Sequence, residues 1–103
     1  MFEVRYADAA RDDLLRLFDF LLERAQTAED FDAAQLAVDV ITQTVGRSLS
    51  QTPFVYRKAG ASPFLRELLI PFRRAGYVAL YEIDNAVNVT VLAVRHQVED
   101  DYH

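Results

Sequence analysis

Five cationic side chains gather in one stretch of this 103-residue chain, between positions 57 and 74. They are Arg57, Lys58, Arg66, Arg73 and Arg74. The stretch holds a single acid, Glu67, whereas the whole chain carries a net charge of −5. Guanidinium and ammonium groups bind phosphates and carboxylates, so this cationic zone predicts a site for a phosphate or an acidic peptide. The alternative is that these are solvated charges on a loop and on strand edges.

Arg66 is the cation that most needs an explanation. It falls among Phe64, Leu68 and Ile70, which share one face of a predicted strand. A buried or groove-lining guanidinium requires a partner. We therefore expect Arg66 to pair with an acidic group, either inside the domain or from a binding partner.

Histidine and cysteine limit the other chemistry. The chain has no cysteine, which excludes disulfides, thiol catalysis and thiolate zinc sites. The two histidines, His96 and His103, do not have the spacing of a metal site. We expect no metal and no cofactor. His96, at the end of a predicted strand, is more typical of a surface or packing residue than of a catalyst.

The N-terminal half must supply helices. Residues 2–6 alternate apolar and polar side chains, which predicts a half-buried strand. Apolar residues then recur every three or four positions and predict an amphipathic helix over about residues 9–25, with Asp8 as its N-cap. Thr27 and Asp30 form a variant of the capping box and begin a second helix of about 20 residues. It ends before Pro53, so the two helices form an antiparallel hairpin.

The C-terminal half must supply a sheet. Residues 53–63 predict an exposed loop, after which the apolar period changes to two. Strands are expected over 64–72, 77–83 and 87–94, with turns at 74–76 and at Asp84-Asn85. Such short turns require antiparallel pairing. Pro71 indicates that its strand lies at an edge or ends there.

The expected fold is therefore one α+β domain over residues 1–103. An N-terminal strand and a two-helix hairpin precede a three-stranded antiparallel sheet, which the first strand joins (β-α-α-β-β-β). Tyr77 and Tyr81 share one face of their strand and are expected to pack under the helices. No apolar run approaches the ~20 residues of a membrane span, and no secretory signal begins the chain, so we expect a cytoplasmic protein without a membrane partner.

Four segments in this order resemble the RelE/ParE superfamily of type II toxin–antitoxin toxins, and the ParE branch most closely. They are Val4–Leu14 with an A-x-x-D-L helix start, Phe64–Leu68 with R-x-L, Tyr77–Ile83 with Y-x-x-x-Y, and Val91–Gln97 with V-x-H. The resemblance covers nearly the whole chain. It implies a bacterial growth-inhibitory protein that a cognate antitoxin neutralises, in a hetero-oligomer. ParE-like members act on DNA gyrase, and RelE-like members cleave mRNA on the ribosome.

Charge and residue types separate the two activities. RNA cleavage without a metal needs a base, an acid and cations for the phosphorane. The candidates are Arg66 and Arg73 as cations, with Tyr81, His96 and Tyr102 as proton-transfer groups. A protein at −5 meets unfavourable electrostatics near ribosomal RNA. The favoured hypothesis is therefore a gyrase-directed toxin that is not an enzyme, and a ribosome-dependent, metal-independent endoribonuclease is the alternative.

The C-terminal end keeps a third hypothesis open. Many relatives carry a basic residue after the His-Gln pair, whereas Val98 and the acids at 99–101 follow here. A non-toxic partner that only binds the antitoxin would fit this tail. Under every hypothesis we expect an apolar groove with flanking cations and a strand edge near Pro71 to bind antitoxin or target. The residues predicted at that surface are Arg57, Lys58, Arg66, Arg73, Arg74, Arg95 and His96.

Overall fold

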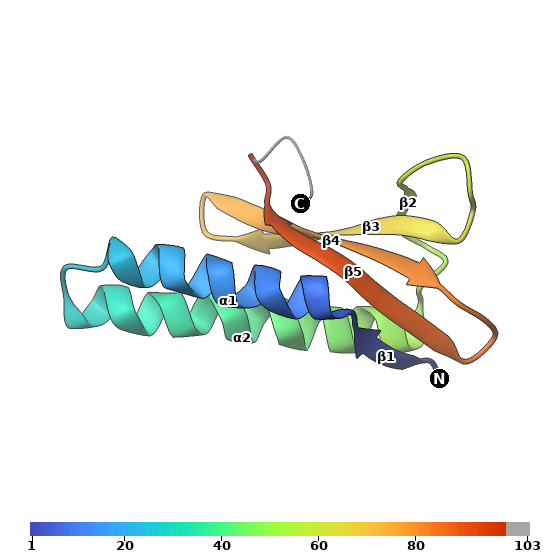
Figure 1. The fold of residues 1–103 in the computed structure, drawn as a ribbon, viewed down its shortest axis with the longest axis horizontal. Helices are drawn as coiled ribbons and strands as arrows, with labels where there is room; N and C mark the ends of the chain where they lie inside the picture. The colour runs from blue at the N-terminus through green and yellow to red at the C-terminus, as the bar shows by residue number, and fades with distance from the viewer. Residues whose placement is uncertain (99–103) are drawn as a thin grey trace.

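The computed structural model describes residues 1–98 and places a helical hairpin along one face of a sheet (Figure 1). The elements are β1 (Glu3–Tyr6), α1 (Asp8–Glu23), α2 (Ala28–Gln51), β2 (Arg57–Lys58), β3 (Leu65–Phe72), β4 (Ala75–Ile83) and β5 (Asn88–His96). The predicted α+β order of strand, two helices and strands is confirmed. The turn between the helices projects past the β3–β4 hairpin (Figure 1). No helix in the described part of the chain is long and apolar enough to cross a bilayer.

The sheet differs from the predicted three-stranded antiparallel sheet. It has five strands in the order β1-β5-β4-β3-β2, and β1 runs parallel to β5. The chain reverses direction four times between these two strands, at the helical turn, after α2 and at two hairpins. An even number of reversals returns the chain to its first direction, so β5 meets β1 in parallel. The extra strand β2 arises inside the predicted loop and pairs antiparallel with β3 through two residues.

Helix boundaries follow local chemistry. The capping box of α2 is confirmed, since the Thr27 hydroxyl accepts the Asp30 N–H and the Asp30 carboxylate accepts the Thr27 N–H. The prediction for α1 was wrong by one residue: its N-cap is Ala7, which makes no side-chain cap. Asp8 is instead the first helical residue, where a carboxylate still interacts favourably with the helix dipole.

The β3–β4 turn also lies earlier than predicted. Phe72 pairs with Ala75, so the turn residues are Arg73 and Arg74. Arg73 has a φ of 54°, in the left-handed region that residues with a Cβ seldom occupy. Gly76 belongs to β4, where an added Cβ would lie 2.6 Å from the carbonyl oxygen of Ile70. Glycine is therefore required for close strand packing and not for the turn.

The core lies between the helices and the alternate positions of β4. Tyr77, Ala79, Tyr81 and Ile83 are all buried on this face, which confirms the predicted place of both tyrosines. They pack with Ile41, Val45 and Leu49 of α2, among others. Within residues 1–98, no helix covers the opposite face of the sheet (Figure 1).

Asp13 joins α1 to the sheet. It is the aspartate of the A-x-x-D-L segment, it is 4% exposed, and its carboxylate accepts the Val94 N–H at 2.8 Å. The pairing of β1 with β5 ends at Val91. Asp13 therefore accepts from a residue of β5 that lies beyond the end of that pairing. This bond lies close to the register shift between β4 and β5. This bond accounts for the buried aspartate in the second turn of α1.

Candidate functional site

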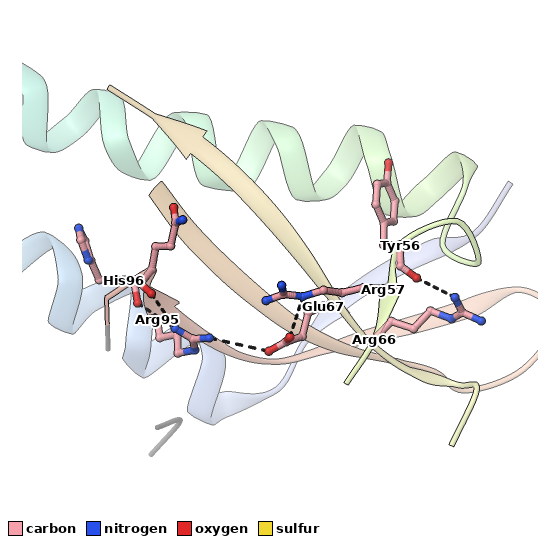
Figure 2. A network of polar contacts seen from close by, with 7 residues as sticks. Tyr56, Arg57, Arg66, Glu67, Arg95 and His96 are labelled. Atoms are coloured by element: carbon pink, nitrogen blue, oxygen red, sulfur yellow. Dashed lines mark hydrogen bonds and ion pairs between the residues drawn. The ribbon is translucent and has the colours of Figure 1, made fainter. Parts of the chain in front are cut away.

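The open face of the sheet carries a chain of ionic contacts. Glu67 on β3 accepts the Arg57 Nε–H at 3.0 Å and lies 4.0 Å from the Arg95 guanidinium on β5 (Figure 2). The Glu67 and Arg95 side chains are 15% and 13% exposed, and Arg57 is half-exposed. Arg95 also donates to the backbone carbonyls of His96 and Gln97. The charge of Arg57 is therefore largely matched within the domain.

Arg66 is held by the loop between α2 and β3. Its Nε–H donates to the Pro63 carbonyl and its Nη1–H to the Tyr56 carbonyl, both at 2.7 Å. Its guanidinium lies 5.6 Å from the centre of the Phe54 ring. The predicted acidic partner is not found among residues 1–98. Both acceptors are neutral, so neither offsets the Arg66 charge.

Tyr81 is a buried structural donor. Its hydroxyl donates to the Pro53 carbonyl at 2.5 Å, and the ring has no exposure to solvent. Burial raises the pKa of Tyr81 to about 12, with the Arg66 charge acting in the opposite direction. A phenol that stays protonated and already donates to the backbone is poorly placed to move a substrate proton.

His96 lies on the helix-facing side of the sheet, at the far end from Tyr81. Its ring meets Tyr77 edge to face at 5.5 Å, and its Nδ1 accepts the Val98 N–H at 3.3 Å. Together with Leu17 and Phe20 of α1, these residues line a mainly apolar pocket of about 340 Å³. Burial also raises the pKa of Tyr77. Tyr102, the other proton-transfer candidate, lies outside the described residues.

Arg73 and Arg74 occupy the tip of the β3–β4 hairpin. Arg73 lies 5.4 Å from the Phe72 ring and close to Asp30 at the start of α2. The pKa of Asp30 is lowered, first by the Gln26 N–H, then by its bonds to Thr27 and least by Arg73. Arg74 is exposed, as is Lys58 on β2, and within residues 1–98 neither side chain makes a hydrogen bond or an ion pair.

The predicted site residues therefore do not form one site. Arg57 and Arg95 meet on Glu67, Lys58 and Arg66 lie at the loop, and Arg73 and Arg74 lie at the hairpin tip. His96 lies on the other face of the sheet. Of the five groups considered for RNA cleavage, Tyr102 lies outside the described residues. Arg66 and Tyr81 are register partners at the loop end of the sheet, whereas Arg73 and His96 lie toward the hairpin tip.

Sequence reasoning missed an aromatic surface beside Arg66. The rings of Phe2, Phe54 and Phe64, here called the phenylalanine patch, pack edge to face at 6.4 and 6.2 Å. Phe54 and Phe64 are 48% and 49% exposed. The available signal was Phe54-Val55 in a segment predicted to be an exposed loop, where apolar side chains have no core to enter.

The chain is similar to known proteins both in sequence and in fold. A family model described as "ParE toxin of type II toxin-antitoxin system, parDE" matches residues 4–101. Among solved structures, the chain resembles one titled "Chromosomal ParDE TA system from P. aeruginosa". The TM-score is 0.72 at 20% identity, over 96% of this chain and 98% of that chain, so this likeness supports the fold. Comparison with curated proteins gives no match.

Proposed function

This chain belongs to the ParE toxin family of type II toxin–antitoxin systems, and from this premise we propose that it inhibits growth by binding DNA gyrase. A toxin with this target would work in the cytoplasm. We further propose that a cognate antitoxin neutralises it in a hetero-oligomer.

The observation that carries a binding mechanism is that the groups considered for RNA cleavage do not converge on one accessible point: Arg66 and the buried Tyr81 are neighbours, but Arg73 and His96 lie toward the other end of the sheet. Tyr81 is buried and donates to Pro53, and Arg66 donates to two carbonyls of the adjacent loop. His96 packs on Tyr77 on the helix-facing side of the sheet. Metal-free cleavage needs these groups around one phosphate. Their placement, with a net charge of −5, favours a toxin that acts by protein contact.

The proposed antitoxin surface is the outer edge of β3 and the hairpin tip. β2 covers β3 only at Glu67 and Arg66, so the edge beyond them is open at Leu69 and Pro71. Leu69 is 46% exposed. An extended segment can add to such an edge, and its acidic side chains would then meet Arg73 and Arg74.

Charge reversal tests this placement. Arg73→Glu and Arg74→Glu should each weaken antitoxin binding about tenfold in a calorimetric titration, because a favourable pair becomes a repulsive one. Arg66→Glu does not test this placement, because Arg66 lies at the loop end and the variant also loses two loop bonds. Unchanged affinity of the Arg73 and Arg74 variants would contradict an antitoxin site at the tip.

The target is tested by inducing the chain with and without its antitoxin and measuring DNA supercoiling and translation. Gyrase inhibition with intact mRNA is the expected result. Ribosome-dependent cuts in mRNA would identify the endoribonuclease alternative instead. No growth defect at good expression would identify a non-toxic antitoxin-binding protein.

A further inference from the structure

We infer that the phenylalanine patch, together with Arg66, is the surface that contacts the toxin's protein target. It is suited to an apolar side chain flanked by a carboxylate. This inference rests on the proposed function, because it assigns the target and the antitoxin to different ends of the molecule.

The patch is exposed, aromatic and hollowed. Phe54 and Phe64 are about half-exposed, and a depression of about 490 Å³ lies between the three rings, Ile83 and the turn at 84–86. Contiguous exposed apolar surface on a small domain marks an interaction site. Aromatic side chains and arginine are enriched where protein interfaces derive most of their affinity.

The surface around the patch is held by buried and backbone bonds. Pro53, which precedes Phe54, is fully buried and its carbonyl accepts the Tyr81 hydroxyl. The Phe64 carbonyl accepts the Ile83 N–H at 2.8 Å, and the Phe2 N–H donates to Ser50 at 2.7 Å. Preorganised contact residues lose less entropy on binding. This is the feature that distinguishes the patch from apolar side chains scattered on a loop.

Charge indicates what kind of partner fits. Arg66 lies against the patch with only neutral acceptors, and Lys58 is its register partner across β2 and β3. Asp84 also lines the depression, where its carboxylate accepts the neutral Thr90 hydroxyl and so keeps its charge. Arg66 and Lys58 together exceed it by one positive charge, which complements a carboxylate on the incoming protein.

A second copy of the chain fits this surface poorly. A symmetric dimer contact would place Arg66 and Lys58 near their own counterparts, where like charges repel. The antitoxin is proposed at the β3–β4 hairpin tip, at the other end of the sheet from this loop (Figure 1). With a second copy and the antitoxin set aside, we assign the patch to the toxin's protein target.

The test compares the double variant Phe54→Ala/Phe64→Ala with Phe31→Ala. Phe31, on α2, is 51% exposed and is thus a matched control outside the patch. Each protein is induced in cells and is also purified for gyrase supercoiling assays, antitoxin calorimetry and thermal unfolding. We expect the double variant to need about thirtyfold more protein to inhibit supercoiling and to lose growth arrest. Its antitoxin affinity should stay within about threefold, and Phe31→Ala should match the wild type throughout.

The outcomes separate this inference from the proposed function. If the wild type arrests growth without inhibiting supercoiling, gyrase is wrong as the target, and growth arrest by the double variant still tests the patch. Undiminished growth arrest by the folded double variant would overturn the patch. An equal loss of antitoxin affinity would overturn it too, as would a wild-type dimer that the double variant abolishes. A wild type that does not arrest growth overturns both.

Discussion

The two ends of the β3–β4 hairpin hold arginine in opposite ways. At the loop end, Arg66 donates to the Pro63 and Tyr56 carbonyls beside the buried Tyr81. At the tip, Arg73 rests over Phe72 with a left-handed φ of 54°, and Arg74 is exposed. Arg66 thus fixes the conformation of the loop beside it, whereas Arg73 and Arg74 lie exposed at the tip. The same residue type is thus bonded to the backbone at one end and exposed at the other, where we propose that it binds the antitoxin.

Removing Arg66 should have the largest effect on stability. Arg66→Ala loses two charge-assisted bonds and leaves two loop carbonyls without their donor, so we expect unfolding to become easier by about 3 kcal/mol. Denaturant titration measures this change. Arg74→Ala is the control at the tip and should change stability by less than about 0.5 kcal/mol. Equal effects at both ends would contradict the contrast between them.

Tyr81→Phe removes a single buried bond at the loop end and should cost about 2 kcal/mol, because the Pro53 carbonyl is left unsatisfied. Tyr6→Phe is the matched control, since the Tyr6 hydroxyl is buried and has no hydrogen-bond partner among the described residues. Its removal should change the free energy of unfolding by less than about 0.5 kcal/mol. If Tyr81→Phe is as mild as Tyr6→Phe, the bond to Pro53 does not support the loop.

Alkaline pH tests the same phenol without removing it. Burial raises the pKa of Tyr81 to about 12 from an ordinary value of 10.0, so the folded state holds this proton more tightly. The stability it contributes is complete below pH 10 and declines as pH rises toward 12. By pH 11 the loss should be about 1 kcal/mol. Tyr81→Phe should flatten part of the decline. A decline of the same size in that variant would assign it to Tyr6, whose pKa burial also raises to about 12.

Arg73→Gly should separate fold from recognition at the tip. Glycine adopts a φ of 54° without strain, so we expect a small gain of about 0.5 kcal/mol in stability. The same variant should bind antitoxin less tightly, because it loses a displayed cation. Thermal unfolding and calorimetry measure the two effects. Unchanged antitoxin affinity would mean that the Arg73 side chain does not contact the antitoxin.

The smallest effect is expected on the open face. Arg57→Gln removes one contact of Glu67 from a half-exposed ion pair, and it should cost less than about 0.5 kcal/mol. This cost should shrink further in high salt. A larger loss that salt does not change would show that the Arg57–Glu67 contact stabilises the fold as much as the loop-end bonds of Arg66 do.

Sequence patterns predicted most of the elements, but they did not predict how the fold distributes the candidate site residues. Helical spacing located both helices, and the period of two located β3, β4 and β5, because each pattern repeats within one element. The capping box at Thr27 was correct for the same local reason. The N-cap of α1 and the β3–β4 turn were each misplaced by about one residue. The five cations at 57–74 were predicted to form one zone because they are near in sequence, but the fold divides them between the open face, the loop and the hairpin tip.

What the sequence determined by itself is the set of elements other than β2 and the face that each one buries, since side-chain periodicity is a property of neighbouring residues. Only the tertiary structure decided which elements meet. The parallel pairing of β1 with β5, the bond from Val94 to Asp13 and the two carbonyls that hold Arg66 join residues brought together by the path of the whole chain. The phenylalanine patch arises in the same way, from three segments that no local pattern relates.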